Sequence, residues 1–293
     1  MTPAQEWPGD AATVTRWVRA SLRPEEAELE VRGLADVRVS CEVAGDDLEH
    51  LTLDASDVEL RVRAPKNGTA SSAAATTPSE TPAVVHRRRG TARTLRVTAR
   101  PVRIEGVPLT IDAQVHDTPV EWLVYAEPAV AGRPESRFGI EVVEEGAGMR
   151  GSLLASLGAA DLTPLLTRVL RPAVQAGGMR LRRVRAHVAQ DGADGIRVDV
   201  AAGVRWRVLP ASARATVRVG LRPDGVITVR DIRVSSGNPV IALALRAARK
   251  PIRAEIGRSH DLNEILGLGS SAPRLHDVRV TIDDDITITA RLG

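Results

Sequence analysis

Aromatic residues are scarce in this sequence, at 2% of its 293 residues. Apolar residues nevertheless reach 43%, so we expect an interior filled by Val, Leu, Ile and Ala. Proteins that bind single-stranded nucleic acids stack bases on aromatic side chains. The chain also lacks a helix-turn-helix, zinc or RNP motif, and the two absences together argue against a nucleic-acid partner.

Lysine is almost missing as well, because Lys66 and Lys250 are the only lysines among 40 basic residues. The 37 acidic residues leave a net charge of only +3. We interpret the many arginines as the composition of a GC-rich genome rather than as the sign of a polyanionic partner.

Cysteine occurs once, at Cys41, which excludes an intrachain disulfide. Its neighbours, VRVSCEV, predict a strand and a buried structural thiol rather than a reactive one. The N-terminus, MTPAQEWPGD, lacks the basic and apolar segments of a signal peptide, and no run of 18 apolar residues predicts a transmembrane helix. We therefore expect a cytoplasmic protein.

Catalytic motifs are missing too: the chain has no G-x-S-x-G, H-E-x-x-H, P-loop or C-x-x-C. His187 stands near Asp191 and Asp194, but on a strand and a turn, where a metal ion would need a further ligand partner. Glu144 and Glu145 are adjacent, so in a strand they point to opposite faces and make a poor catalytic pair. We expect neither an enzyme nor a cofactor or metal site.

Alternation of apolar and polar residues is what the chain does contain, and it predicts strands. The pattern covers 28–63, resumes at 94–145, and returns over 180–236 and 274–293. Residues 64–93, rich in Pro, Ser, Thr, Ala and Gly without a period, predict a disordered loop. Long alternating strands with few helices predict an α+β protein with a long, curved antiparallel β-sheet.

Residues 12–22 predict a short amphipathic helix, with apolar side chains at helical spacing at Val14, Trp17, Val18 and Leu22. This helix can dock on the domain or rest in a membrane interface, and we favour docking. Residues 1–22 thus form an N-terminal tail and helix.

Residues 152–176 predict a second helix. Its apolar positions follow the spacing i, i+3, i+4, i+7 and i+8, at Leu162, Leu165, Leu166, Val169 and Leu170. Asp161 is placed to cap this helix, and Pro172 to kink it or to end it early.

The stretch SSGNPVIALALRAARKPIRAEIG, residues 235–257, predicts a third helix that is apolar on every side at its start and basic at its end. A helix that is apolar all round is normally enclosed. We therefore expect the sheet to wrap around the helices at 152–176 and 239–250, with the basic residues at a rim.

An internal repeat is also visible. RLRRVRAHV begins at Arg180 and RLHDVRVTI at Arg274, DLTPLL and DLNEIL precede them, and a turn and a further strand follow each. A weaker match joins VRIEGVPL to IRVSSGNPV. The shared order predicts two related halves, 23–203 and 204–293, the first of which carries the loop at 64–93.

A family resemblance rests on ELEVRGLADV, DDLEHLTLDASDVEL, VRIEGVPL, VRDIRVSSGNPVIALAL and RLHDVRVTIDDDITITARLG. These stretches resemble the LmeA-type phospholipid-binding proteins, which are similar to the wider TULIP group of lipid-binding tubular domains. The resemblance covers residues 27–293 without the loop. It implies a sheet curled around a long helix, with acyl chains held between them. Members are often exported or lipid-anchored, whereas this N-terminus shows no export signal.

The sequence and the resemblance together suggest a non-catalytic protein that binds or transfers phospholipid. The apolar candidates for contact with acyl chains are Leu162, Leu165, Leu166, Val169, Val240, Ile241, Leu243 and Leu245. The basic candidates for contact with a phosphate headgroup or an anionic membrane surface are Arg246, Arg249 and Lys250. The alternative interpretations are an ordinary core for the apolar set and a solvated helix end for the basic set.

We accordingly expect transient contact with the inner face of the membrane. The alternative function is a structural or adaptor module with a filled core, whose sheet edge or N-terminal helix binds another protein. An enzyme that acts on a lipid would need polar groups that converge in a groove. The sequence leaves the oligomeric state open.

Overall fold

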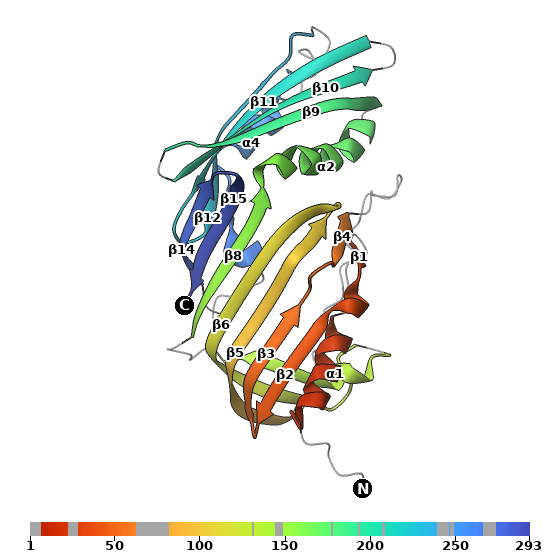
Figure 1. Ribbon diagram of the computed structural model, residues 1–293, viewed down its shortest axis with the longest axis vertical. Coiled ribbons are helices and arrows are strands. Elements are labelled where there is room, and N and C mark those ends of the chain that lie inside the picture. Colours follow the sequence, from red (N-terminus) through yellow and green to blue (C-terminus); the bar gives the residue numbers. More distant parts are fainter. Residues whose placement is uncertain are drawn as a thin grey trace. The chain divides into compact units, whose positions relative to one another are not determined.

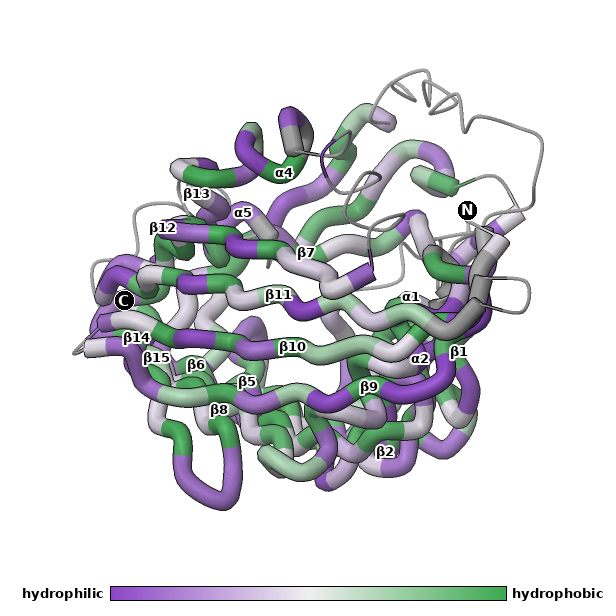
Figure 2. Tube along the Cα trace, turned by 90° about the horizontal axis from the view of Figure 1, so that it is seen from above, coloured by the Kyte–Doolittle hydropathy of each residue, from purple (hydrophilic) through white to green (hydrophobic). Residues whose placement is uncertain are grey.

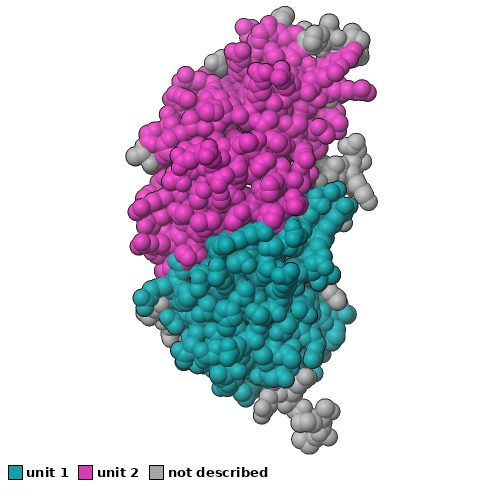
Figure 3. Space-filling view, in the orientation of Figure 1, with its two compact units in different colours: residues 1–100, 112–151 teal, residues 101–111, 152–293 magenta. Residues whose placement is uncertain are grey.

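The computed structural model describes most of the chain, in the ranges 7–22, 29–62, 82–130, 132–143, 149–176, 178–192, 194–206, 209–238, 246, 249–265 and 274–293. Over these ranges the fold is α+β, with mostly antiparallel strands, few helices and no closed sheet (Figure 1). The chain divides into two compact units (Figure 3). Unit 1 comprises residues 1–100 and 112–151, and unit 2 comprises residues 101–111 and 152–293.

Unit 1 combines a helix with a mixed sheet. Its elements are α1 (Ala11–Ser21), β1 (Leu29–Arg32), β2 (Arg38–Ala44), β3 (Asp47–Asp54), β4 (Glu59–Val62) and β7 (Phe138–Val142), together with most of β5 (Val84–Ile104) and β6 (Val107–Tyr125). β3 pairs antiparallel with β2 and parallel with β5, and β7 pairs antiparallel with β6.

Unit 2 is built around a five-stranded antiparallel sheet. Its elements are most of β8 (Arg150–Gly158), then α2 (Leu162–Ala176), β9 (Met179–Gln190), β10 (Gly195–Trp206), β11 (Leu209–Leu221), β12 (Val226–Ser235), α4 (Arg249–Glu255), β13 (Ser259–Asp261), α5 (Leu262–Ile265), β14 (Leu275–Ile282) and β15 (Asp285–Leu292). The five strands have the order β13-β12-β11-β10-β9. The other sheet has the order β1-β4-β5-β6-β8-β15-β14, with β3, β2 and β7 attached off this path.

Helix α1 confirms the predicted amphipathic helix. The carboxylate of Asp10 accepts a hydrogen bond from the backbone N–H of Thr13, which satisfies a free donor at the helix start. Val14 and Val18 are 1% and 7% exposed, and α1 packs against β2. The apolar side of the helix is therefore used within unit 1, as the docking interpretation predicted.

Four of the six aromatic residues cluster in unit 1. The ring centroid of Trp7 lies 5.2 Å from that of Trp17, 5.4 Å from that of Trp122 and 4.9 Å from that of Phe138. The indole of Trp122 donates to the carbonyl of Asp46 at 2.8 Å, which satisfies its buried N–H. The expectation of a purely aliphatic interior is thus wrong for this unit, because residues far apart in the sequence converge on one cluster.

The five-stranded sheet has one apolar and one polar face, as Figure 2 shows by the alternation of colours along β10 and β11. The apolar face carries Val184, Val188, Val198, Val200, Val217, Val219, Ile232 and Val234, which the strand registers place in rows. Helix α2 packs against β9, and Thr163 exchanges hydrogen bonds with the backbone of Ala186. Edge strand β9 is thus covered where a further strand could otherwise pair.

Part of the predicted loop at 64–93 is strand. Residues 84–93 begin β5, and residues 63–81 lie outside the described part. Arg87 pairs with the carboxylate of Glu121 on β6 at 2.8 Å, and Arg88 pairs with that of Asp46, in the turn between β2 and β3, at 2.9 Å. These ion pairs link the start of β5 to segments that are distant in the sequence.

The predicted helices also change at their ends. Residues 152–158 belong to β8, and α2 begins only at Leu162, where the helical spacing of apolar residues begins. The helix runs through Pro172 to Ala176 rather than ending early. From the third predicted helix, α4 covers Arg249–Glu255, and residues 239–245 lie outside the described ranges.

The predicted boundary between two halves, at 203 and 204, falls inside β10. It therefore lies within the five-stranded sheet of unit 2.

Candidate functional site

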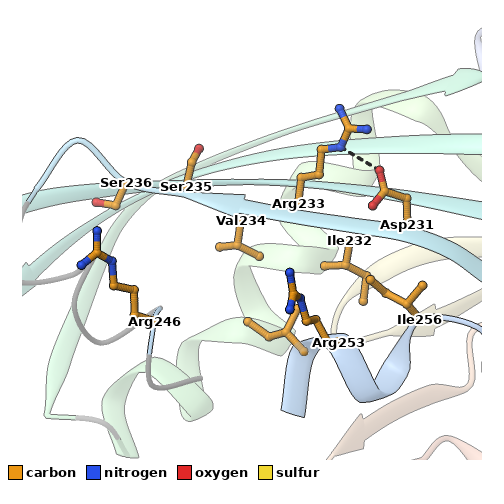
Figure 4. A pocket seen from close by; sticks show the side chains of 10 residues that line it. Asp231, Ile232, Arg233, Val234, Ser235, Ser236, Arg246, Arg253 and Ile256 are labelled. Carbon is orange, nitrogen blue, oxygen red and sulfur yellow. Dashed lines mark ion pairs between the residues drawn. The ribbon is translucent and has the colours of Figure 1, made fainter. Parts of the chain in front are cut away.

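A pocket of about 580 Å³ lies beside β12 in unit 2 (Figure 4). Its lining residues come from β12, from α4 and from the segments that follow each: Asp231, Ile232, Arg233, Val234, Ser235, Ser236, Arg246, Ile252, Arg253 and Ile256. We name this cavity the β12–α4 pocket. Its volume falls in the range of sites for small ligands.

The pocket exists because β12 has a partner strand on its outer side only at its start. β13 pairs with Val226, Ile227 and Thr228, and the chain of α4 then meets β12 at one point. There the N–H of Val229 donates to the carbonyl of Arg258 at 3.0 Å, and the N–H of Gly257 donates back to the carbonyl of Val229 at 2.8 Å. Beyond this point α4 diverges from β12, and residues 231–235 border the cavity.

The floor of the pocket is aliphatic. Ile232 and Val234 belong to the apolar face of the sheet and point into the pocket (Figure 4). Ile252 of α4 also lines the pocket. All three are half-buried, and Ile256 is 38% exposed. These side chains have apolar area in contact with water that a ligand can still bury, at about 25 cal/mol per Å².

The rim of the pocket is basic. Arg246 and Arg253 are exposed, and no carboxylate among the described residues pairs with either of them. Arg233 differs, because its Nε lies 2.8 Å from Asp231. Asp231, Arg233 and Ser235 point to the other face of β12, and the hydroxyl of Ser236 donates to the carbonyl of Ser212 at 2.5 Å (Figure 4). The guanidinium groups of Arg246 and Arg253, which have no carboxylate partner among the described residues, form the part of the rim that suits a phosphate group.

The predicted site residues are distributed over several places. Leu162, Leu165 and Leu166 are half-buried on α2, Val169 is 52% exposed, and none of the four lines the β12–α4 pocket. The set Val240, Ile241, Leu243 and Leu245 lies outside the described residues.

Of the predicted basic residues, Arg246 lines the pocket, while Lys250 is exposed on α4 without lining it. Arg249 begins α4. Arg253 belongs to the basic end that the sequence predicted at a rim, although it was not among the candidates for headgroup contact. Sequence reasoning missed the apolar residues Ile232, Ile252 and Ile256. The alternation in VITVRDIRVSS does place Ile232 and Val234 on one face, but nothing in the sequence shows that α4 lies beside them.

Three further observations concern metal ligands, helix length and Cys41. Over the described ranges, no group of three His, Cys, Asp or Glu side chains could hold a metal ion. No helix in the described part of the chain is long and apolar enough to cross a membrane. Burial raises the pKa of Cys41 to about 11, which disfavours the reactive thiolate at neutral pH.

Comparison of the chain with protein-family models, with curated proteins and with solved structures gave no match.

Proposed function

We propose that the protein is a non-catalytic phospholipid-binding or lipid-transfer protein, with the β12–α4 pocket as its binding site. The observation that carries the proposal is the pairing of an aliphatic floor with an unpaired basic rim in one cavity. A phospholipid presents the same two chemistries in one molecule. Its acyl carbons contact Ile232, Ile252 and Ile256, and its phosphate contacts Arg246 and Arg253.

The energetics of such binding are favourable. Each methylene that leaves water contributes about 0.8 kcal/mol, and charge-assisted hydrogen bonds from two arginines add to this. Since neither Arg246 nor Arg253 has to leave a carboxylate of the described chain, the phosphate does not compete with an internal ion pair.

The proposal includes a TULIP-like arrangement, in which a curved sheet wraps around apolar helices and two related halves contribute. Two observations support it. α2 packs against the five-stranded sheet, and the order of an Asp residue, a helix and an antiparallel hairpin recurs over 161–206 and 261–292. We further propose that the lipid comes from the cytoplasmic face of a membrane, which the protein contacts peripherally.

The alternative is a structural or adaptor module. An adaptor that binds its partner through the N-terminal helix loses support, because the apolar side of α1 is buried within unit 1 through Val14 and Val18. A filled pocket that takes no lipid would favour the remaining route, through a sheet edge.

Native mass spectrometry of the full chain, with organic extraction, tests the lipid-binding function. We expect adducts of phospholipid mass, either on purification or after incubation with phosphatidylcholine–phosphatidylglycerol vesicles. The double variant Ile252→Ser, Ile256→Ser removes apolar area from α4, and the adducts should fall at least tenfold.

Val85→Ser is the matched control, because Val85 is an exposed apolar residue of β5, far from the pocket in sequence and in the other unit. This variant should keep the adducts. Arg246→Gln with Arg253→Gln should shift the bound lipids away from anionic classes. A wild-type mass that stays free of adducts after vesicle incubation would refute lipid binding and favour the adaptor function.

A further inference from the structure

A second concave site lies on the polar face of the five-stranded sheet, opposite the apolar face. It is a shallow depression of about 250 Å³ lined by Arg185, Ala186, His187, Asp199, Val200, Ala201, Arg214, Ala215 and Thr216. The cross-strand register explains the hollow. Ala201 pairs with Arg185 on one side and with Arg214 on the other. A methyl group thus stands between two long side chains, and we name the depression the Ala201 hollow.

Arg185 and Arg214 are both exposed, and no carboxylate in the described part of the chain pairs with either. The strand spacing places their Cα atoms about 10 Å apart, two strands across. At that separation two flexible arginine side chains can both reach one anion over Ala201. Each guanidinium offers a planar set of donors that matches a phosphate.

The carboxylate in the hollow is already partly neutralised. Thr216 donates its hydroxyl hydrogen to Oδ1 of Asp199 at 2.7 Å, and Nε of Arg197 lies 3.1 Å from Oδ2. The hollow therefore keeps two uncompensated positive charges, with His187 beside Asp199 in the same row. Asp199 retains lone pairs that can accept a hydrogen bond from a ligand hydroxyl.

Protection of a sheet edge is a simpler explanation for an exposed arginine, but it applies to only one of the two. Charged side chains on an edge strand prevent pairing with another sheet, and Arg185 lies on edge strand β9. Arg214 lies on β11, between β10 and β12, where there is no edge to protect. Four other arginines of these strands, Arg197, Arg218, Arg230 and Arg233, have carboxylate partners, whereas Arg185 and Arg214 have none in the described part of the chain.

We propose that the Ala201 hollow binds the phosphate group of a phosphorylated polyol, with Arg185 and Arg214 on the phosphate and Asp199 on a hydroxyl. The ligand can be a soluble phosphate ester or a phosphomonoester lipid headgroup, and both present the same chemistry. Aromatic side chains are missing from the residues that line the hollow, which disfavours stacked nucleic-acid bases as the ligand. The site is separate from the β12–α4 pocket, so the two proposals can fail independently.

The test titrates the full chain with inorganic phosphate and with glycerol 3-phosphate by calorimetry at low ionic strength. A parallel arm measures co-sedimentation with phosphatidylcholine vesicles with and without phosphatidic acid. We expect Arg185→Gln and Arg214→Gln each to weaken binding about tenfold, and the double variant about a hundredfold. Arg230→Gln is the matched control, because this exposed arginine of the same sheet pairs with Asp194 at 2.7 Å, and it should bind like the wild type.

If the Arg185→Gln, Arg214→Gln double variant loses binding of inorganic phosphate and glycerol 3-phosphate but still binds vesicles like the wild type, the result would support the site with a soluble ligand. Loss restricted to vesicles that contain phosphatidic acid would support it with a lipid ligand. Binding that is equal in the wild type and the double variant, or no binding to either probe, would overturn the proposal. Tighter binding of a single-stranded oligonucleotide than of either phosphate probe would also overturn it.

Discussion

The two units differ in how completely they bury their large side chains. The largest side chains that are less than 2% exposed are Trp7, Trp122, Leu48, Val14, Val120, Thr118 and Pro8, and all of them belong to unit 1. In unit 2, Val198, Val200, Val217, Ile232 and Val234 on the apolar face of the five-stranded sheet stay half-buried. The most completely buried side chains thus lie in unit 1, whereas part of this face in unit 2 keeps apolar area within reach of water.

This difference separates scaffold from binding surface. The side chains that unit 1 buries completely stabilise it through internal packing. A unit that leaves aliphatic side chains half-exposed in a concave region has stability still to gain from a ligand. The β12–α4 pocket, with Ile232 and Val234 in its lining, is such a region of unit 2, while unit 1 has a cavity of its own that is lined by residues of α1 and β2.

The largest expected effect is among the buried side chains of unit 1. Trp122→Ala removes a ring that is 1% exposed and leaves the carbonyl of Asp46 without its donor. We expect the free energy of unfolding of unit 1 to fall by about 3–5 kcal/mol. Urea denaturation followed by hydrogen exchange of unit 1 peptides measures this. Ile232→Ala in unit 2 should lower its stability by only about 1–2 kcal/mol, since its side chain already contacts water. Equal losses of unfolding free energy in both units would contradict the difference in burial between them.

A bound lipid should stabilise one unit selectively. At a free lipid concentration of a hundred times Kd, the gain is about 2.7 kcal/mol for the state that binds. We expect hydrogen exchange to slow in β10, β11 and β12, while β2 and β3 keep their rates. Protection that extends equally over both units would contradict the assignment of the pocket to unit 2. The Ile252→Ser, Ile256→Ser variant should show no protection at the same lipid concentration.

Two glycines in strands offer a matched pair of smaller changes. A Cβ built on Gly90 would lie 2.0 Å from the carbonyl oxygen of Asp46 and 2.9 Å from Nε1 of Trp122. Gly90→Ala therefore forces the backbone at Asp46 to move, and we expect a loss of about 1–3 kcal/mol. A Cβ on Gly203 in β10 meets no atom closer than 3.8 Å. Gly203→Ala should leave the melting temperature unchanged within about 2 °C. A sizeable loss in Gly203→Ala would show that unit 2 is packed as tightly as unit 1.

The smallest expected effect concerns an ion-pair cluster of unit 1. Arg96 donates to both carboxylate oxygens of Asp112, at 3.3 and 2.9 Å, and Arg100 donates to the same carboxylate. These hydrogen bonds, from Arg96 foremost, hold the pKa of Asp112 below its usual value of 3.8. A lowered pKa in the folded state adds stability above the unfolded value, and this stability is lost as the pH falls through the folded value.

Asp112→Asn should therefore lower the stability of unit 1 by less than about 1 kcal/mol at pH 7, since the arginines are largely exposed. The difference from the wild type should shrink below pH 4 and vanish near pH 2 in thermal melts. A difference that is constant over this range would mean that packing, rather than charge, is affected.

The matching segments of the internal repeat all lie in the same compact unit. The stretches VRIEGVPL, DLTPLL and RLRRVRAHV, and their matches later in the chain, all fall within the residues of unit 2. VRIEGVPL lies in residues 101–111, which unit 2 takes from the adjoining ends of β5 and β6. The segments that match each other thus share a unit, which the linear order of the sequence did not suggest.

Local patterns predicted the elements well where a single period governs them. The spacing of Val14 and Val18 predicted α1, that of Leu162 to Leu170 predicted the body of α2, and alternation predicted β9 to β12. The candidate site was predicted only in part, since Arg246 lines the pocket and the α2 leucines do not. Ile252 could not be found, and Arg253 was expected only as part of a basic rim, because a pocket depends on how α4 lies beside β12, a contact about 20 residues apart in the chain.

The sequence by itself determined the class of the fold, the abundance of strands, the positions of the main helices and the lack of motifs for catalysis. These properties follow from the periods of apolar residues and from short-range chemistry. Only the tertiary structure decided that Trp7, Trp17, Trp122 and Phe138 meet in unit 1, that 84–93 is a strand, and that arginines without a carboxylate partner among the described residues flank concave sites. Such outcomes depend on which distant segments pair, since neither the partner of a strand nor the partner of a charge can be read from neighbouring residues.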